Sequence, residues 1–297
     1  MNAIAEIAEN QAVVLDLNGQ QVTRNNGRAI SVHETGSSLV VTDSSEQGNG
    51  TIQITGSSGN SGLGIYVRSG NATWIRGILD ASAATTTHEG QGGTAIWINK
   101  GRTFKLYGGT IKGGVPTKCN NGGTVEVSGG GTMEMHGGNV VGSNAPNHSI
   151  NGAAINNTGA LKIYGGTVTG GTTKGVGGAI CARGVTEIRG GIITDGTSGN
   201  GKSIYANGSG DVRITGGTMG DVNIGGKVSV SAAPTIVTLT VAADKLTVGD
   251  LTDGASITVT GTGVVAKNVQ TDVSGYFHSS TGLQIVYDPT AKTLTAQ

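Results

Sequence analysis

The sequence predicts an all-β fold, a right-handed parallel β-helix of about ten coils, from two observations. The first is that apolar and polar residues alternate over short runs, as in Leu161–Gly171, which reads L-K-I-Y-G-G-T-V-T-G-G. Such alternation is typical of a half-buried strand. The second is that this run recurs, with glycine pairs that begin at Gly108, Gly137, Gly165, Gly190 and Gly216. Successive pairs are 29, 28, 25 and 26 residues apart, and a repeat of this length indicates a solenoid.

Composition restricts the classes of protein that fit. Of 297 residues, 55 are glycine and 4 are proline, and 19 basic residues balance 19 acidic ones. This balance indicates neither a nucleic-acid-binding protein nor a polybasic membrane surface. The sequence contains no run of about 18 apolar residues, so no transmembrane span is predicted. Disorder is the competing interpretation of such a glycine-rich chain, and the regular alternation argues against it.

Residues 1–11 are predicted to form an N-terminal cap. If Asn2–Glu9 is helical, Ile4 and Ile7 lie on one face, so we expect a short amphipathic helix that covers the open end of the solenoid. The solenoid itself is expected over residues 12–230.

Each coil of the solenoid is predicted to contain two recognisable strands, of which the second carries the double glycine. Loops of varying length, such as Ala81–Gly92 and Val115–Gly122, then lead to the next coil. Cys119 falls in such a loop and Cys181 on a strand about two coils away, and we expect both to be free thiols. The first strands of the coils are Ile65–Val67, Ile96–Ile98, Val125–Val127, Ile155–Asn157, Ile180–Ala182 and Ile204–Ala206.

Residues 231–297 lack the double glycine and are predicted to form irregular final coils and a capping hairpin. The hairpin is expected from Leu283–Tyr287 and Lys292–Ala296, because the intervening Asp288-Pro289-Thr290-Ala291 is rich in turn formers. Four strands are expected before the hairpin, the first of them just before residue 231. They are Lys227–Val230, Ile236–Val241, Leu246–Val248 and Ile257–Val259.

Three motifs carry a resemblance to a known family. L-D-L-N-G-Q at Leu15–Gln20, the repeated I-Y-G-G-T-V and G-G-A-I at Gly177–Ile180 resemble β-helix proteins of the pectin-lyase-like kind. More narrowly, they resemble the glycine-rich β-helix regions of large cell-surface proteins from gut bacteria. The resemblance covers most of residues 12–230. It implies the fold and says little about function, because that superfamily includes polysaccharide lyases, glycoside hydrolases, phage tailspikes and adhesins.

If the apolar residues of each double-glycine strand point inward, their neighbours form columns on the outside. Residues in one column follow one another at about 4.8 Å per coil. One column changes sign at each step from Lys105 onward, which favours a charge ladder that fixes the strand register. Its members are Gln53, Trp74, Lys105, Glu134, Lys162, Glu187 and Arg213.

A second column suggests a binding surface. Aromatic rings on a flat sheet can cover the apolar faces of sugars while polar neighbours bond their hydroxyls. The alternative is ordinary filling by residues with high strand propensity. The second column is predicted as Thr55, Arg76, Tyr107, His136, Tyr164, Arg189 and Thr215, and the first strands add Tyr66, Trp97, Glu126, Asn156, Cys181 and Tyr205. The candidate glycan-binding residues are Tyr107, Tyr164, His136, Arg76, Trp97 and Tyr66.

The residues expected on the outside of the solenoid do not form the acid pair that catalysis would need. Glycoside hydrolysis needs two carboxyl groups about 5–9.5 Å apart, and the columns contain no adjacent acid pair. Asp80 and Lys112 occupy matching positions one coil apart, which predicts an ion pair. Asp80, Glu89 and Lys118 are placed on two long loops and are the residues that an active site would use if those loops converge. We expect no catalytic residues, cofactor or metal.

The function expected from these features is that of a non-catalytic extracellular or cell-surface module, an adhesin or stalk of bacterial type. Its expected partner is a polysaccharide or host glycan along one flat face, with no nucleic acid and no membrane insertion. We expect a monomeric module of a longer secreted protein, whose signal peptide and anchor lie outside this chain. The alternatives are a polysaccharide lyase or glycoside hydrolase of the same architecture, and a phage tail or receptor-binding spike.

Overall fold

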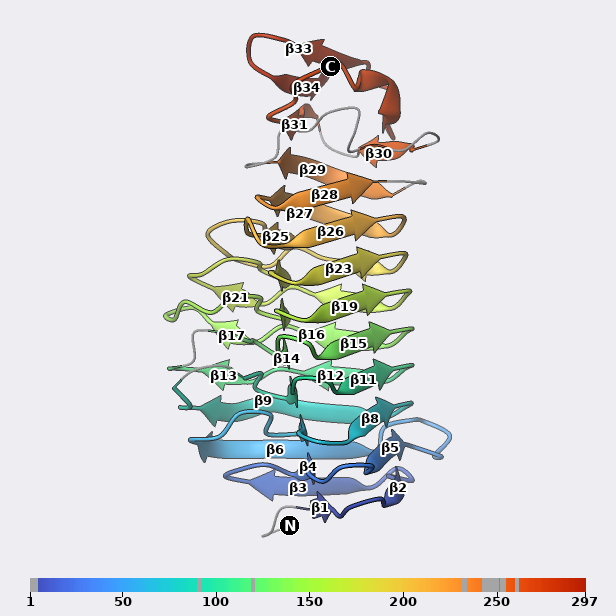
Figure 1. The fold of residues 1–297 in the computed structure, drawn as a ribbon, viewed down its shortest axis with the longest axis vertical. Helices are drawn as coiled ribbons and strands as arrows, with labels where there is room; N and C mark the ends of the chain where they lie inside the picture. Colours follow the sequence, from blue (N-terminus) through green and yellow to red (C-terminus); the bar gives the residue numbers. More distant parts are fainter. Residues whose placement is uncertain are drawn as a thin grey trace.

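The chain forms a parallel β-solenoid of about eight turns in the computed structural model. The structure describes residues 5–89, 92–118, 121–230, 234–241, 251, 255–259 and 262–297. Figure 1 shows strands stacked one above another along the long axis, with the N-terminus at one end and the C-terminus at the other. The predicted class, an all-β parallel β-helix, is confirmed.

Each regular coil contributes one strand to each of three faces. The first and third faces belong to a single 23-stranded sheet, and between them along the chain lies the second face, a nine-stranded sheet. The first face contains β1 (Ala5–Ile7), β4 (Ile30–Val32), β7 (Ile65–Val67), β10 (Ile96–Ile98), β14 (Val125–Val127), β18 (Ile155–Asn157), β22 (Ile180–Ala182) and β25 (Ile204–Ala206). The first strands predicted from β7 to β25 are therefore confirmed.

The second face carries the double-glycine repeat, and each of its strands is called a rung below. All of its pairings are parallel. Its rungs are β2 (Ala12–Asp16), β5 (Ser38–Thr42), β8 (Asn71–Trp74), β11 (Thr103–Leu106), β15 (Thr132–Met135), β19 (Ala160–Ile163), β23 (Val185–Ile188), β26 (Asp211–Ile214) and β28 (Lys227–Val230).

The third face follows the second in each coil. Its strands are β3 (Gln21–Asn25), β6 (Thr51–Ser58), β9 (Ile78–Thr86), β12 (Thr110–Lys112), β16 (Asn139–Val141), β20 (Thr167–Thr169), β24 (Ile192–Ile193), β27 (Thr218–Ile224) and β29 (Thr235–Val241). The coil count, about eight, is lower than the predicted ten, and among the described residues the last strand of the second face is β28.

Inward side chains stack in register to form one continuous core. Leu106 pairs with Trp74 in the preceding rung and with Met135 in the following one. These three side chains are fully buried, and Ile163, Ile188 and Ile214 continue the stack with at most 1% exposure. Burial of one such side chain contributes about 1.5–3 kcal/mol, so the repeated apolar position holds neighbouring coils together.

Glycine is favoured at the two positions of each pair for two different reasons. A Cβ atom on Gly137 would lie 2.6 Å from the carbonyl oxygen of Tyr107 in the preceding coil. Gly138 has a φ of +78°, in the left-handed region that side chains disfavour. The same two constraints recur at each of the five pairs, so the repeat marks a corner where two coils approach closely and the chain turns.

The two long loops predicted at Ala81–Gly92 and Val115–Gly122 are partly strands, which corrects that expectation. β9 continues to Thr86, where it pairs with β6 and with β13 (Val115–Pro116). Further along the solenoid, β17 (Asn144–Ala145) pairs with β21 (Thr172–Thr173). These segments form a flange on one side of the solenoid, visible at the left of Figure 1.

The predicted N-terminal helix is wrong for the residues that the structure describes. Residues 5–7 form strand β1, which pairs in parallel with β4. Ile4 and Ile7 fit a helical face, but Ala5 and Ile7 equally fit one side of a strand, and the backbone ladder to β4 favours the strand.

The predicted C-terminal hairpin is confirmed. β33 (Ile285–Asp288) and β34 (Thr293–Ala296) pair antiparallel, and β34 also pairs antiparallel with β31 (Gly263–Lys267). β30 (Ile257–Val259) pairs with β29 and with β32 (Phe277–Ser279), which follows the short 3₁₀ turn η2 (Ser274–Tyr276). Among the other predicted strands, Lys227–Val230 and Ile236–Val241 correspond to β28 and β29, whereas Leu246–Val248 lies outside the described residues.

Candidate functional site

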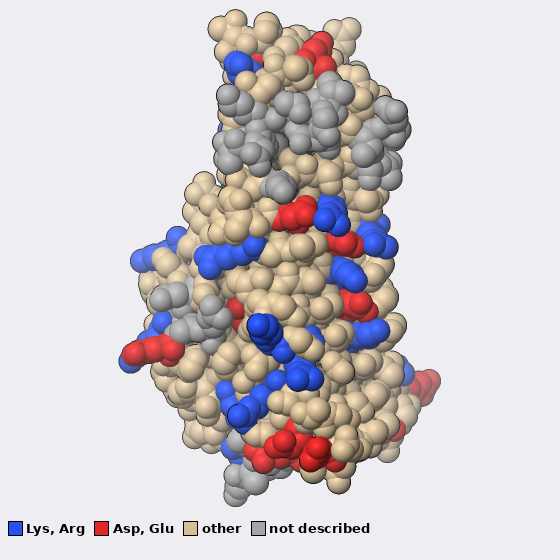
Figure 2. Space-filling model, viewed as in Figure 1, with Lys and Arg blue, Asp and Glu red and all other residues tan. Residues whose placement is uncertain are grey.

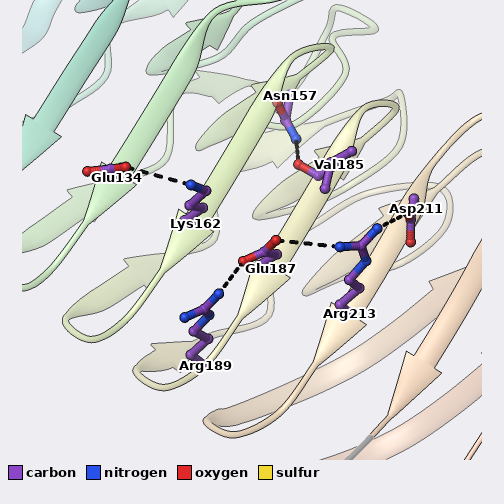
Figure 3. A network of polar contacts seen from close by, with 8 residues as sticks. All are labelled: Glu134, Asn157, Lys162, Val185, Glu187, Arg189, Asp211 and Arg213. Carbon is purple, nitrogen blue, oxygen red and sulfur yellow. Dashed lines mark hydrogen bonds and ion pairs between the residues drawn. The ribbon is translucent and has the colours of Figure 1, made fainter.

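The second face carries the predicted charge ladder on its outer side. Lys105 pairs with Glu134 at 3.2 Å, and Lys162 lies 3.8 Å from the other oxygen of the same carboxylate. Two rungs further along, Arg213 lies 3.7 Å from Glu187. In Figure 2, basic and acidic side chains are interspersed along one side of the molecule, and Figure 3 labels Glu134, Lys162, Glu187 and Arg213. The alternation from Lys105 onward is confirmed.

The two members predicted before Lys105 are wrong. Lys105 pairs with Thr73, not with Trp74, and the Trp74 side chain is fully buried. Gln53 lies on β6 of the third face, so it belongs to a different sheet. The register is misplaced at Trp74 because that coil carries a single glycine, Gly77. Aligning Gly77 with the first glycine of the other pairs shifts the register by one residue.

Within the ladder the cations stand further out than the carboxylates. The lysine and arginine side chains are 34–50% exposed, whereas those of Glu134 and Glu187 are 19% and 17% exposed. Partial burial raises the pKa of Glu134, but the hydrogen bond and charge of Lys105, with Lys162 and His136 nearby, outweigh it and lower the pKa. Glu134 is therefore a carboxylate held between two more accessible cations.

Beside the charge ladder, three aromatic side chains form a continuous stack. The centroids of Tyr107 and His136 are 4.6 Å apart, and those of His136 and Tyr164 are 4.7 Å apart. The ring planes differ by only 7° and 8°. This spacing equals that of neighbouring strands, so the rings lie across the solenoid axis with their faces against one another.

The arginine beyond the stack closes one end of it. The guanidinium carbon of Arg189 lies 5.3 Å from the centroid of Tyr164, within cation–π range. Arg189 also bonds Glu187 at 2.8 Å, which links the stack to the charge ladder. Tyr107, at the other end, is 48% exposed. The ring faces mostly contact one another, so the stack presents edges and polar tips rather than the open faces that were expected.

Arg76 does not join this column, although the sequence placed it there. Ile75 occupies the position one rung before Tyr107, as the backbone bonds of both residues to the preceding rungs show. Arg76 instead donates to the backbone carbonyl of Glu46 at 2.7 Å. The shift has the same origin as that of Trp74, the single glycine in this coil.

Tyr66 and Trp97 form a second aromatic group on the first face. Their rings stack at 4.8 Å, and Arg28 lies over Tyr66 at 4.3 Å. Trp97 donates through its indole nitrogen to Ser128 at 2.9 Å. Both side chains are half-buried. The six candidate glycan-binding residues therefore fall into two groups on different faces, plus Arg76.

A hollow continues the second face past the ring stack. It has a volume of about 360 Å³ and is lined by Glu187, Arg189, Arg213 and Thr215. These residues are the next members of the charged column and of the ring column on β23 and β26. A strip of polar and aromatic side chains, from Lys105 and Tyr107 to Arg213 and Thr215, thus runs along five rungs; it is called the polar strip below.

The next three positions on the first face after Trp97 are buried, although the sequence placed them outward on the surface. Glu126, Asn156 and Cys181 lie side by side on β14, β18 and β22, and all are fully buried. Near this part of the face, Asn121 accepts hydrogen bonds from Asn151 at 2.8 Å and from Arg183 at 3.1 Å. The three buried side chains lie outside the apolar core, and Gly122, which precedes β14 in the chain, lies against the Glu126 carboxyl group.

Burial changes the acid–base properties of these groups. Desolvation raises the pKa of Glu126 to about 7, against the lowering effects of a hydrogen bond from Asn156 and the charge of Arg183. Desolvation also raises the pKa of Cys181 to about 11, although Arg183 favours the thiolate. Cys181 is a free thiol, as expected, and Cys119 lies outside the described residues.

The alternative catalytic residues form two ion pairs with different partners. Asp80 bonds Lys112 at 3.0 Å, which confirms the predicted pair, and it also accepts from Ser82. Glu89 bonds Lys118 at 3.1 Å on the surface. Asp80 lies on strand β9 rather than in a loop. In the described part of the chain, no group of three or more His, Cys, Asp or Glu side chains is arranged to hold a metal ion.

Comparison of the chain with models of protein families, with curated proteins and with solved structures finds no match. No helix among the described residues is long and apolar enough to cross a membrane.

Proposed function

We propose that this chain is a non-catalytic surface module that binds a polysaccharide lengthwise along the polar strip of the second face. The observation that carries the proposal is the stack of Tyr107, His136 and Tyr164. Its two tyrosines are two rungs apart, about 9.6 Å at strand spacing. That distance is close to the length of one disaccharide in an extended chain, so equivalent hydroxyl groups of a polymer meet equivalent tyrosines.

The stack is also suited to binding because its side chains are already ordered. Each ring is held by its neighbours, so little side-chain entropy remains to be lost when a ligand binds. The outward tyrosine hydroxyls can both donate and accept hydrogen bonds. The adjacent charge ladder and the hollow at Arg189 and Arg213 extend this hydrogen-bonding surface along the axis.

The extracellular, bacterial setting belongs to the same proposal. It is supported by the resemblance of the glycine-rich motifs to the β-helix regions of bacterial cell-surface proteins. A rigid rod with a continuous core suits a module that spaces or presents a binding surface outside the cell. This step argues from fold by analogy.

The first prediction tests binding. Replacing Tyr107 and Tyr164 together by alanine removes two ordered hydroxyl partners, and we expect affinity for a polysaccharide found on a glycan array to fall at least about tenfold. The measurement is isothermal titration with that polysaccharide. Tyr205→Ala is the matched control, because Tyr205 is a half-buried tyrosine on the first face. Equal losses in both variants would contradict binding at the polar strip.

The same experiment separates the alternative functions. Mass spectrometry of the recovered sugars should show chains of unchanged length. Shortened or unsaturated products would overturn the non-catalytic proposal in favour of a lyase or hydrolase. An array with no ligand at all would overturn glycan binding itself.

A further inference from the structure

We infer that the ligand of the polar strip is an acidic polysaccharide with one negative group per disaccharide, rather than one per sugar. This inference rests on the proposed function and specifies its ligand. It is drawn from the signs and spacing of the charges in the charge ladder. The cations Lys105, Lys162 and Arg213 stand on every second rung, β11, β19 and β26.

A ligand on the polar strip meets the cations of the charge ladder before its carboxylates. The cations are 34–50% exposed and the intervening carboxylates 17–19%, so the positive groups are the outer ones. Ion pairs at this degree of exposure are weak. A polyanion can therefore replace Glu134 as the partner of Lys105 and Lys162 at little cost in free energy.

The spacing of the cations matches a polymer with a charge on every second sugar. Cations on alternate rungs are about 9.6 Å apart along the axis, which matches negative groups on alternate sugars. A polymer with a carboxylate on every sugar would place an additional charge at the rung between them. On β15 that charge meets Glu134, and the strip offers there only His136, which lies 3.7 Å from the same carboxylate.

The other end of the polar strip discriminates less between the two kinds of acidic polymer. On β23 the carboxylate of Glu187 is bonded by Arg189 at 2.8 Å, and on β26 Arg213 is bonded by Asp211 at 2.8 Å. The charges of each of these pairs offset one another. Glu134 is therefore the residue that most strongly disfavours a fully charged polymer, while Lys105 and Lys162 on either side favour the alternating one.

The test compares three polymers on the intact chain. They are a polymer of alternating glucuronate and N-acetylglucosamine, a polygalacturonate with a carboxylate on every sugar, and a neutral β-linked glucan. We expect the alternating polymer to bind most tightly, with an affinity that falls as salt is raised. Tighter binding of the polygalacturonate, or equal binding of the neutral glucan, would overturn the inference while leaving glycan binding in place.

Two variants assign the effect to the ladder. Glu134→Gln should reduce the ratio of the affinities for the alternating polymer and the polygalacturonate by about fivefold, because it removes the repulsion between Glu134 and a ligand carboxylate at that rung. Lys162→Gln should weaken binding of the alternating polymer by a similar factor and leave binding of any neutral glycan unchanged. Glu89→Gln, in the distant surface pair with Lys118, is the control. An unchanged preference in Glu134→Gln would contradict the assigned role.

Discussion

Replacing Glu126 by glutamine is expected to stabilise the protein by about 3 kcal/mol at pH 8.5 and to leave it unaffected or slightly destabilised at pH 4. The folded-state pKa of Glu126 is raised from 4.5 to about 7, mainly by burial. Between these values the folded chain holds a proton that the unfolded chain has released. The free energy of unfolding of the natural sequence therefore falls as pH rises from 4.5 to 7, by about 1.4 kcal/mol per unit at most.

Urea unfolding of the natural protein and the Glu126→Gln variant across this pH range measures the effect. The difference between the two curves should grow from pH 4.5 to 7 and then stay constant, because both states have lost the proton above pH 7. Glu89→Gln is the control, since Glu89 is exposed and its removal should leave the pH dependence unchanged. Parallel curves for the natural protein and Glu126→Gln would show that Glu126 ionises normally in the folded chain.

Gly138→Ala is expected to destabilise the protein by about 3 kcal/mol, combining backbone strain with overcrowding. Gly138 has a φ of +78°, and a Cβ atom there would lie 2.8 Å from the backbone of Gly108 in the preceding coil. Since the contact is with backbone, the neighbour cannot move aside as a flexible side chain would.

Gly101→Ala provides a matched comparison. Gly101 has a φ of +72°, yet no atom lies within 4 Å of the added Cβ position. This substitution carries the strain without the crowding, so we expect a loss of about 1–2 kcal/mol. Thermal or urea unfolding of both variants gives the difference, which measures how closely adjacent coils approach. Equal losses would mean that the corner relaxes to admit the methyl group.

Much of the fold could be predicted because its information is local and repeated. Strand alternation around Leu106 and Ile163 identified the inward positions, and the recurring glycine pairs identified the period. The alternating signs at Lys105, Glu134 and Lys162 then identified neighbours in space. Each of these depends only on residues within one coil and its adjacent copies.

The errors occur where the repeat is broken or where distant segments meet. In the coil of Trp74 a single glycine replaces the pair, which moved Trp74 and Arg76 out of their predicted columns. Glu126 lies outside the apolar core as alternation requires, yet it is fully buried, with Gly122 against its carboxyl group. Alternation gives the side of a strand on which a residue lies, but it does not show what covers that side.

The stacking of the aromatic rings was also beyond the sequence argument. Placing Tyr107, His136 and Tyr164 in one column followed from the register, whereas the orientation of their planes depends on side-chain rotamers. Because the rings are spaced like the strands that carry them, they pack face to face, and this changes the expected contact with a sugar from ring faces to ring edges.

The parallel stacking of coils has a mechanical consequence. The hydrogen bonds between strands run along the long axis, so a pull applied between the two ends loads the ladders in series, and the outermost coil can peel away before the others. A coil of 25 to 29 residues would release roughly 80–100 Å of extended chain as it opens. Under load such a molecule unfolds one coil at a time, and the coils that remain stacked keep their own part of the polar strip intact.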